Sequence, residues 1–252
     1  MTKNLKVLTL QFEAAPGNKD KNLKTFAKLM KENGDFEPDL VILPEVWNVG
    51  CDYKKFHELA EFIPYETTML LSGVASKYHT NIIAGSIIEK THDNKFFNTS
   101  LILNREGAVI GQYRKNYTFS HCGSDEGKYI EKDDRITVID IEGIKYGIGI
   151  CYDIRFPELF REMVKHKAEV FVVPAAFPPE RIEQWNILNQ ARALENLAIL
   201  ISCNQYGASN VVSPHGKILR TSERGEKAIR NIIDIDEISK TRSETPFLND
   251  IK

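Results

Sequence analysis

The sequence predicts one α/β domain in which β-strands are layered against helices. Its 252 residues suit a single large domain, and 42% of them are hydrophobic and 27% charged, the ordinary balance of a globular protein. Runs such as Val41–Leu43 and Val170–Val173 contain no polar residue, which is typical of strands covered on both faces. No Pro/Gly/Ser-rich linker divides the chain. We therefore expect a single domain over residues 1–252, with a core at about 5–236 and a tail at 237–252.

About a dozen short apolar runs have the length and composition of β-strands. In chain order they are Lys6–Phe12, Leu40–Leu43, Asn81–Ile88, Thr99–Leu103, Val109–Arg114, Ile136–Ile141, Lys145–Ile150, Val170–Val173, Ala198–Cys203, Val211–Val212, Ile218–Leu219 and Ile229–Ile235.

Four segments between these runs show the one-sided apolar spacing of an amphipathic helix. They lie around residues 23–30, 70–78, 156–164 and 182–191. The stretch from Asn116 to Asp134 is long and polar instead. Loops of that length are usually functional, so we expect this one to border the binding site.

Charge and composition exclude several classes of partner. Lys and Arg number 33 against 35 Asp and Glu, a net charge of -2, and no basic stripe supports nucleic-acid binding. The apolar runs are too short to span a membrane, and residues 1–4 enter the first strand without a signal-like segment. The four cysteines form no C-x-x-C pair and the six histidines no H-E-x-x-H motif. We expect a cytoplasmic protein with no zinc site or membrane association.

The strongest local signal is the run Gly147–Glu158, GIGICYDIRFPE. An apolar strand leads to Cys151, and Pro157 is placed to open a helix, so Cys151 sits at a strand-to-helix elbow (residues 150–156). Backbone N–H groups and the positive helix end at such a turn lower the pKa of a thiol and can bind an oxyanion. Cys151 is therefore a candidate nucleophile for acyl transfer, although its position alone also suits a buried structural cysteine.

Glu45 and Lys115 are the candidate partners of this thiol, because the spacing of the sequence suggests no acidic partner for any of the histidines. Glu45 follows a buried strand that Pro44 ends, and Lys115 ends another strand just before the polar loop. A desolvated carboxylate can move a proton, and an ammonium can stabilise an oxyanion. Taken singly, each also fits a surface charge.

Three blocks of this sequence resemble the signatures of the nitrilase, or carbon-nitrogen hydrolase, superfamily. They occur in that family's order and are Leu43–Glu45, Tyr113–Lys115 with Phe119, and Gly149–Glu158. Further matches extend from about Lys6 to Asp236 and include Asn98–Ser100, Val173–Ala176, Gln190–Asn196 and Ser213–Gly216. The resemblance implies an α-β-β-α sandwich of two mixed sheets flanked by helices, built as a single domain.

The resemblance also implies roles for individual residues. Glu45 would be the general base, Lys115 the group that stabilises the oxyanion, and Cys151 the nucleophile, a Glu-Lys-Cys triad. Glu126 fits best as the second family glutamate, orienting Lys115, and the backbone N–H of Tyr152 would help to bind the oxyanion. Candidate substrate contacts are Arg155, Phe119, Phe177 and Trp185, with Arg181 an alternative to Arg155 for holding a carboxylate. Asp153, Glu158, Arg192, Glu195 and Asn196 are expected to hold the elbow.

The implied enzyme is a cysteine-dependent amidase that needs no cofactor and works as a homodimer. The run Val173–Trp185 is similar to the branch with omega-amidases, which act on 2-oxo-acid amides such as alpha-ketoglutaramate. N-carbamoyl amines and deaminated glutathione-type amides are alternative substrates. A catalytically silent binding homologue and a thiol redox protein, in which Cys122 would resolve Cys151, are alternatives of another class. The chain departs from the family in a short segment after Asn204 and a short C-terminal tail.

Overall fold

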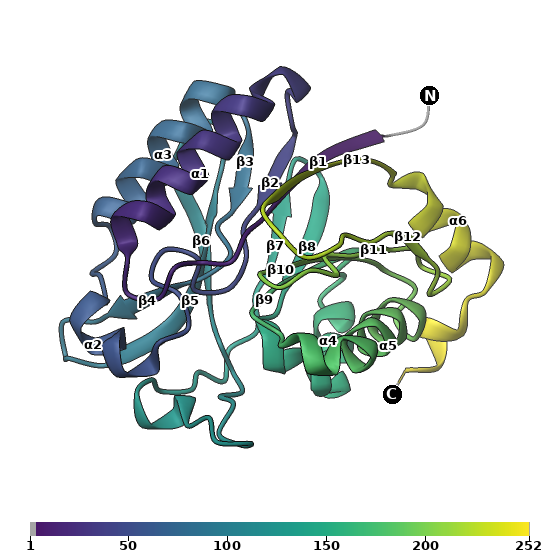
Figure 1. Cartoon of the computed structure of the whole chain (residues 1–252). Helices are drawn as coiled ribbons and strands as arrows, with labels where there is room; N and C mark the ends of the chain where they lie inside the picture. The colour runs from purple at the N-terminus through teal and green to yellow at the C-terminus, as the bar shows by residue number, and fades with distance from the viewer. Residues whose placement is uncertain (1–3, 252) are drawn as a thin grey trace.

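The computed structural model describes residues 4–251 and consists of two mixed β-sheets packed face to face, with helices on both outer sides (Figure 1). The predicted α-β-β-α sandwich is thereby confirmed. Residues 1–3, on which the expectation about a signal-like segment falls, and residue 252 lie outside the described range. None of the helices within residues 4–251 is both long and apolar enough to cross a bilayer.

The first sheet has seven strands in the order β13-β1-β2-β3-β5-β4, with β6 paired to β5. Their bounds are β1 (Asn4–Gln11), β2 (Leu40–Ile42), β3 (Asn81–Ile83), β4 (Ile87–Lys90), β5 (Phe96–Leu103), β6 (Val109–Arg114) and β13 (Lys227–Asp234). The pairs β1–β2 and β2–β3 are parallel, and the others are antiparallel.

The second sheet has six strands in the order β12-β11-β10-β9-β8-β7. Their bounds are β7 (Val138–Ile141), β8 (Ile144–Ile148), β9 (Val170–Ala175), β10 (Ile199–Asn204), β11 (Val211–Val212) and β12 (Ile218–Arg220). The three central strands β8, β9 and β10 run parallel.

All four predicted helices are present, and the described part of the chain contains two further α-helices. The α-helices are α1 (Lys19–Asn33), α2 (Phe56–Leu59), α3 (Glu66–Tyr78), α4 (Pro157–Lys165), α5 (Ile182–Leu194) and α6 (Asp236–Glu244). Short 3₁₀ helices are η1 (Gly34–Phe36), η2 (Tyr53–Lys55), η3 (Glu126–Lys128), η4 (Cys151–Arg155), η5 (Pro179–Arg181) and η6 (Phe247–Asp250). The expected tail is thus ordered into α6, which buries Ile238 against the core.

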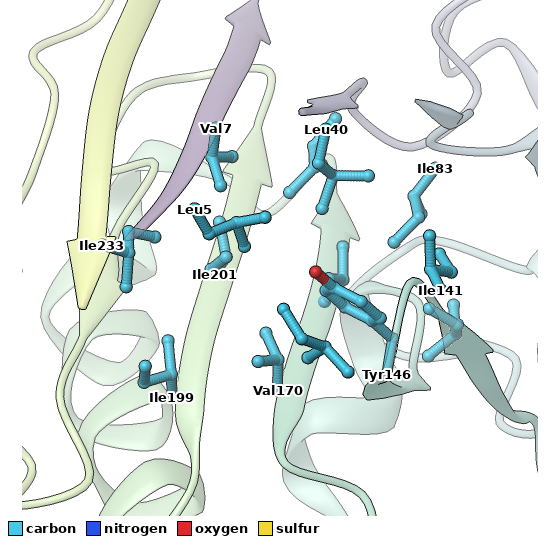
Figure 2. Packing of buried hydrophobic residues seen from close by; sticks show 14 of the residues in the cluster. Leu5, Val7, Leu40, Ile83, Ile141, Tyr146, Val170, Ile199, Ile201 and Ile233 are labelled. Atoms are coloured by element: carbon cyan, nitrogen blue, oxygen red, sulfur yellow. The ribbon is translucent and has the colours of Figure 1, made fainter. Parts of the chain in front are cut away.

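Side chains of the central strands alternate between two cores, which explains why runs such as Val41–Leu43 and Val170–Val173 contain no polar residue. On β1, Val7 faces the second sheet, whereas Leu8 packs beneath α1 and α3. On β9, Val172 faces the first sheet and Phe171 faces the α4–α5 layer. Figure 2 shows the inter-sheet core, where side chains from strands of both sheets point toward one another.

The segment predicted as one strand over Asn81–Ile88 forms two strands, β3 and β4. The break lies at Gly85, whose φ is +58° and where a Cβ atom would come within 1.9 Å of the Pro44 carbonyl oxygen. Only glycine fits so close a backbone approach, and the chain turns there instead of continuing the ladder. This contact matters for the site, because Pro44 directly precedes Glu45.

Candidate active site

Glu45 lies in the turn that follows β2, and its position is fixed mainly through the backbone. The N–H of Ser86 donates to the Pro44 carbonyl at 3.2 Å, and the Ser86 hydroxyl accepts the N–H of Val46 at 2.9 Å. The Gln205 amide donates to the Glu45 carbonyl at 2.7 Å. Glu45 is only 4% exposed, so its carboxylate points into the protein and is not a surface charge.

Lys115 follows β6 and places a buried ammonium between two carboxylates. Its Nζ donates to Glu45 Oε1 at 2.8 Å and to both carboxylate oxygens of Glu126 at 2.9 Å. The Asn98 amide also bridges the two glutamates, donating to Glu45 Oε1 at 2.9 Å and to Glu126 Oε1 at 3.3 Å. All four side chains are nearly excluded from solvent. These contacts join residues from β5, the end of β6, the turn after β2 and the polar loop.

Glu126 comes from the long polar loop, as expected for a site-bordering segment. It begins η3 and is 2% exposed, although Gly127 and Lys128 directly after it are exposed. The backbone N–H of Phe119 donates to Glu126 Oε2 at 2.7 Å. Glu126 therefore faces Lys115, while its neighbour Glu131 is exposed.

Cys151 begins η4 three residues after the last residue of β8, Ile148, which places it at the predicted elbow. Its φ is +49°, a left-handed conformation that is costly for a residue other than glycine. Pro157 opens α4 a few residues later. The N–H of Ala176, at the end of β9, donates to Glu45 Oε2 at 2.9 Å and is close enough to Cys151 to act on its pKa. Glu45 and the thiol therefore share one wall of the site.

The expectation that the elbow lowers the thiol pKa is wrong for the resting site. Burial raises the pKa of Cys151 well above its ordinary value, and the charge of Glu45 and hydrogen bonding to that carboxylate raise it further. Lys115 and the Ala176 N–H act in the opposite direction but do not compensate. The ammonium of Lys115 is already neutralised by two carboxylates, so the thiol rests protonated and requires a base.

Lys115 remains charged despite its burial. Burial by itself lowers the pKa of Lys115, but Glu126, Glu45 and Cys151 outweigh it, and the pKa is raised well above the usual value. A permanently protonated amine in a dry site is suited to stabilise a developing oxyanion.

These residues open into a pocket of about 500 Å³, its open mouth included. The lining residues are Glu45, Val46, Cys51, Tyr53, Phe56, Asn98, Lys115, Phe119, Glu126, Cys151, Tyr152, Arg155, Ala176, Phe177, Pro178 and Arg181. The structure thus brings together the four predicted catalytic residues and the predicted contacts Tyr152, Arg155, Phe119 and Phe177.

Trp185 is the one predicted substrate contact outside this lining. Its ring is fully buried on α5, its Nε1 donates to the Ala208 carbonyl at 2.9 Å, and its ring centroid lies 4.9 Å from that of Phe177. Trp185 therefore supports Phe177 from behind. Helical spacing placed it on an apolar face but could not show which layer that face meets.

The sequence did not predict several residues that line this pocket. Asn98 carried a motif match but no role. Cys51, Tyr53 and Phe56 carried no signal, because they come from a segment with the two short helices η2 and α2, which tertiary packing brings to the pocket. Cys122, the expected resolving cysteine of the redox alternative, is exposed and is not among the lining residues, whereas Cys51 is. Within residues 4–251, no cluster of three or more His, Cys, Asp or Glu side chains could hold a metal ion.

Comparison with known proteins identifies the family. The carbon-nitrogen hydrolase family profile matches residues 8–243. The chain belongs to the carbon-nitrogen hydrolase family. It is therefore an enzyme that hydrolyses carbon–nitrogen bonds other than peptide bonds.

Two curated relatives and one solved structure illustrate how far the similarity extends. This carbon-nitrogen hydrolase is 31% identical to the 2-oxoglutaramate amidase of Bacillus subtilis, with 96% of each chain covered. It is 32% identical to the omega-amidase NIT2-B of Xenopus laevis, covering 94% of this chain and 91% of the relative. The crystal structure of Saccharomyces cerevisiae Nit3, described as a member of branch 10 of the nitrilase superfamily, matches with a TM-score of 0.87 at 30% identity over 97% of this chain and 95% of Nit3.

Proposed function

We propose that this enzyme is an omega-amidase-like amidase that converts the amide of a small carboxylate-bearing acid, such as 2-oxoglutaramate, to the acid and ammonia. The observation that carries this proposal is the Lys115 ammonium held by Glu45 and Glu126 in the same pocket as Cys151, with two arginines in the lining. The names of the relatives from Bacillus subtilis and Xenopus laevis support the substrate class.

In the first half-reaction, Glu45 removes the thiol proton as the Cys151 sulfur attacks the amide carbon. The carbonyl electron pair moves to oxygen, and Lys115 and the backbone N–H of Tyr152 stabilise the oxyanion. When this intermediate collapses, the carbon–nitrogen bond breaks and Glu45 passes its proton to the departing ammonia. A thioester on Cys151 remains.

In the second half-reaction, Glu45 deprotonates a water molecule that attacks the thioester. Collapse of the second tetrahedral intermediate breaks the carbon–sulfur bond, returns the proton to the sulfur and releases the acid. Glu126 acts through Lys115, because both of its oxygens accept from the ammonium and hold it toward the thiol. Every step uses groups of this chain.

Arg155 and Arg181 are the groups proposed to bind the substrate carboxylate. Within residues 4–251 neither guanidinium forms an ion pair with Asp or Glu, although Arg155 donates to the Gln184 amide oxygen at 2.8 Å. Arg181 lies over the Phe119 ring at 5.0 Å, and Arg155 over the Phe177 ring at 5.5 Å. An unpaired guanidinium braced by an aromatic ring suits bidentate capture of a carboxylate.

We further propose a cytoplasmic homodimer. All four cysteines are free in the structure, which suits a reducing compartment. The α5 helix exposes Ile187 by 65% and Leu194 by 49%, two turns apart on one face. Apolar side chains in such an array favour burial against another copy.

An ammonia-release assay tests the proposed function. We expect turnover of 2-oxoglutaramate and much slower turnover of a neutral amide of equal length, because the latter cannot pair with the arginines. Cys151→Ala should abolish turnover, whereas Cys122→Ser, at an exposed cysteine outside the pocket, should match the wild type. Nitriles and N-carbamoyl amines complete the screen. Equal rates for the charged and neutral amides, or activity in Cys151→Ala, would contradict the proposal.

A further inference from the structure

Asp153 is a fully buried carboxylate two residues after Cys151, and it accepts hydrogen bonds from three groups. Its Oδ2 accepts the backbone N–H of Ile150 at 2.8 Å and the Tyr113 hydroxyl at 2.7 Å. Its Oδ1 accepts the backbone N–H of Tyr117 at 2.9 Å. No substrate step assigned above uses this group.

The three donors flank the two reacting side chains. Tyr113 and Tyr117 lie two residues before and two residues after Lys115, and Ile150 directly precedes Cys151. One carboxylate therefore connects the segment that carries the amine, at the end of β6, with the elbow that carries the thiol. We propose that Asp153 is a positioning residue that fixes the Lys115 ammonium relative to the Cys151 sulfur, a role that rests on the proposed function of these two groups.

Backbone strain at the nucleophile makes such an anchor necessary. The left-handed conformation of Cys151 persists only if its surroundings hold it there. The bond from the Ile150 N–H fixes the peptide before Cys151, and on the far side of the elbow the Arg192 guanidinium donates to the Ile154 carbonyl at 2.8 Å. Arg192 ties the elbow to α5, whereas Asp153 ties it to the Lys115 segment.

Aromatic packing also joins these segments but lacks direction. The Tyr117 ring stacks on Phe156 with centroids 3.5 Å apart, and Phe119 packs edge-on to Tyr152. Stacked rings can slide at little cost, whereas hydrogen bonds constrain both distance and angle. Asp153 therefore supplies the directional part of the connection. Its loss should disturb the position of Lys115 relative to Cys151 more than it weakens the packing of the two segments.

The charge state of Asp153 adds a measurable signature. Burial raises the pKa of Asp153 to about 7, although Lys115 and the hydrogen bonds from Ile150, Tyr113 and Tyr117 act to lower it. The other charged groups at the elbow are Arg155, which belongs to η4, Glu45, which acts on Cys151, and Arg192, which donates to the Ile154 carbonyl. A protonated Asp153 has one oxygen that must donate, so it cannot accept from all three partners. Turnover should therefore fall as the pH drops below about 7.

Asp153→Asn and Tyr113→Phe test the inference. Asparagine has a single acceptor oxygen, so its NH₂ group must face a backbone N–H and one connection is lost. We expect kcat to fall about 100-fold, the order of loss for a misplacement near 1 Å, with KM within about twofold because the pocket arginines are untouched. Tyr113→Phe keeps both backbone bonds but loses the hydroxyl bond, so its kcat should fall measurably, by less than about tenfold. The acidic decline near pH 7 should disappear in Asp153→Asn.

Asp140→Asn is the matched control, because this exposed carboxylate caps only the β7–β8 turn, accepting from the Gly143 N–H. Thermal unfolding of each variant separates positioning from stability. The inference would be overturned if the Asp153→Asn variant has a lower melting temperature but keeps the wild-type kcat. A raised KM with an unchanged kcat in this variant would overturn it as well. Should Asp153→Asn fail to fold, wild-type kcat and an unchanged acidic limb in folded Tyr113→Phe would overturn it instead.

Acylation by a short p-nitrophenyl ester distinguishes failure of the inference from failure of the proposed function. This reaction needs the Cys151 sulfur and the oxyanion site but not the natural amide. A wild-type enzyme that is acylated yet inert toward 2-oxoglutaramate would reject the proposed substrate. Unimpaired acylation of Asp153→Asn would reject the positioning role.

Discussion

At the scale of single residues, the site holds two carboxylates against one ammonium, and this excess of negative charge adds to burial in keeping the thiol protonated. Glu45 and Glu126 together neutralise Lys115 and leave nothing to stabilise a thiolate at rest. The nucleophile is therefore generated only when Glu45 takes the proton, during attack on the substrate. Premature thiolate chemistry such as oxidation is suppressed by the same arrangement.

Glu45→Gln separates the two effects of this carboxylate, which are proton transfer and the raising of the thiol pKa. Turnover should fall by about 10²–10⁴-fold, because the proton-transfer group is lost. The alkylation of Cys151 by iodoacetamide should shift toward lower pH, because the negative charge that helps to raise the thiol pKa is gone. The measurement is the alkylation rate against pH, with mass spectrometry separating Cys151 from Cys51.

Glu131→Gln provides the control, since this exposed glutamate lies in the polar loop and does not line the pocket. Its turnover and alkylation profile should match the wild type. An alkylation midpoint in Glu45→Gln that is unchanged or moves to higher pH would show that Glu45 does not govern the thiol.

The roles of residues could be predicted only where a family motif assigns a role to that position. Glu45, Lys115, Cys151 and Glu126 were predicted as a set, and all four line one pocket, where Lys115 contacts both glutamates. The bridging function of Asn98 depends on two amide protons meeting two distant carboxylates, which no local pattern encodes. The direction in which the thiol pKa is shifted could likewise not be predicted from the sequence, because it follows from burial and charge balance.

At the scale of elements, the turn after β2 depends on the break between β3 and β4. Gly85 lets the chain pass against the Pro44 carbonyl, and Ser86 then binds both sides of Glu45. Apolar composition predicted a continuous strand there because Ala84–Ile88 still looks strand-like in sequence. The signal that was missed is the isolated glycine, which in a strand often marks a close backbone approach.

Gly85→Ala should displace the Glu45 turn. The new Cβ would sit 1.9 Å from the Pro44 oxygen at a φ of +58°, so the backbone must shift. We expect a loss of about 2 kcal/mol or more of unfolding free energy and a fall in kcat of at least about tenfold. Chemical denaturation and ammonia release measure the two effects.

Gly73→Ala is the matched control on α3, where a Cβ would meet nothing within 4 Å. Alanine favours a helix over glycine, so this variant should gain about 0.5–1 kcal/mol and keep full activity. Wild-type stability and turnover in Gly85→Ala would show that the close approach at Pro44 does not hold the turn.

At the scale of the whole molecule, the site lies where the two sheets meet, and each sheet supplies part of it. Glu45 and Lys115 follow β2 and β6 of the first sheet, whereas Cys151 and Ala176 follow β8 and β9 of the second. The inter-sheet core seen in Figure 2 therefore sets the spacing of base, amine and thiol. The layered architecture was predictable from alternation of elements, but the registration of one sheet on the other was not, because it depends on how side chains from both sheets interlock.

The proposed dimer can be tested without touching the site. Ile187→Glu places a charge on the exposed face of α5, and sedimentation velocity should change from dimer to monomer because burying an unpaired carboxylate is costly. Ile232→Glu on β13 is the matched control, since Ile232 is also 65% exposed, and it should remain dimeric. Ile187 does not line the pocket, so the monomeric variant should retain most of its kcat. A dimer that persists in Ile187→Glu but dissociates in Ile232→Glu would move the interface from α5 to the edge of the first sheet.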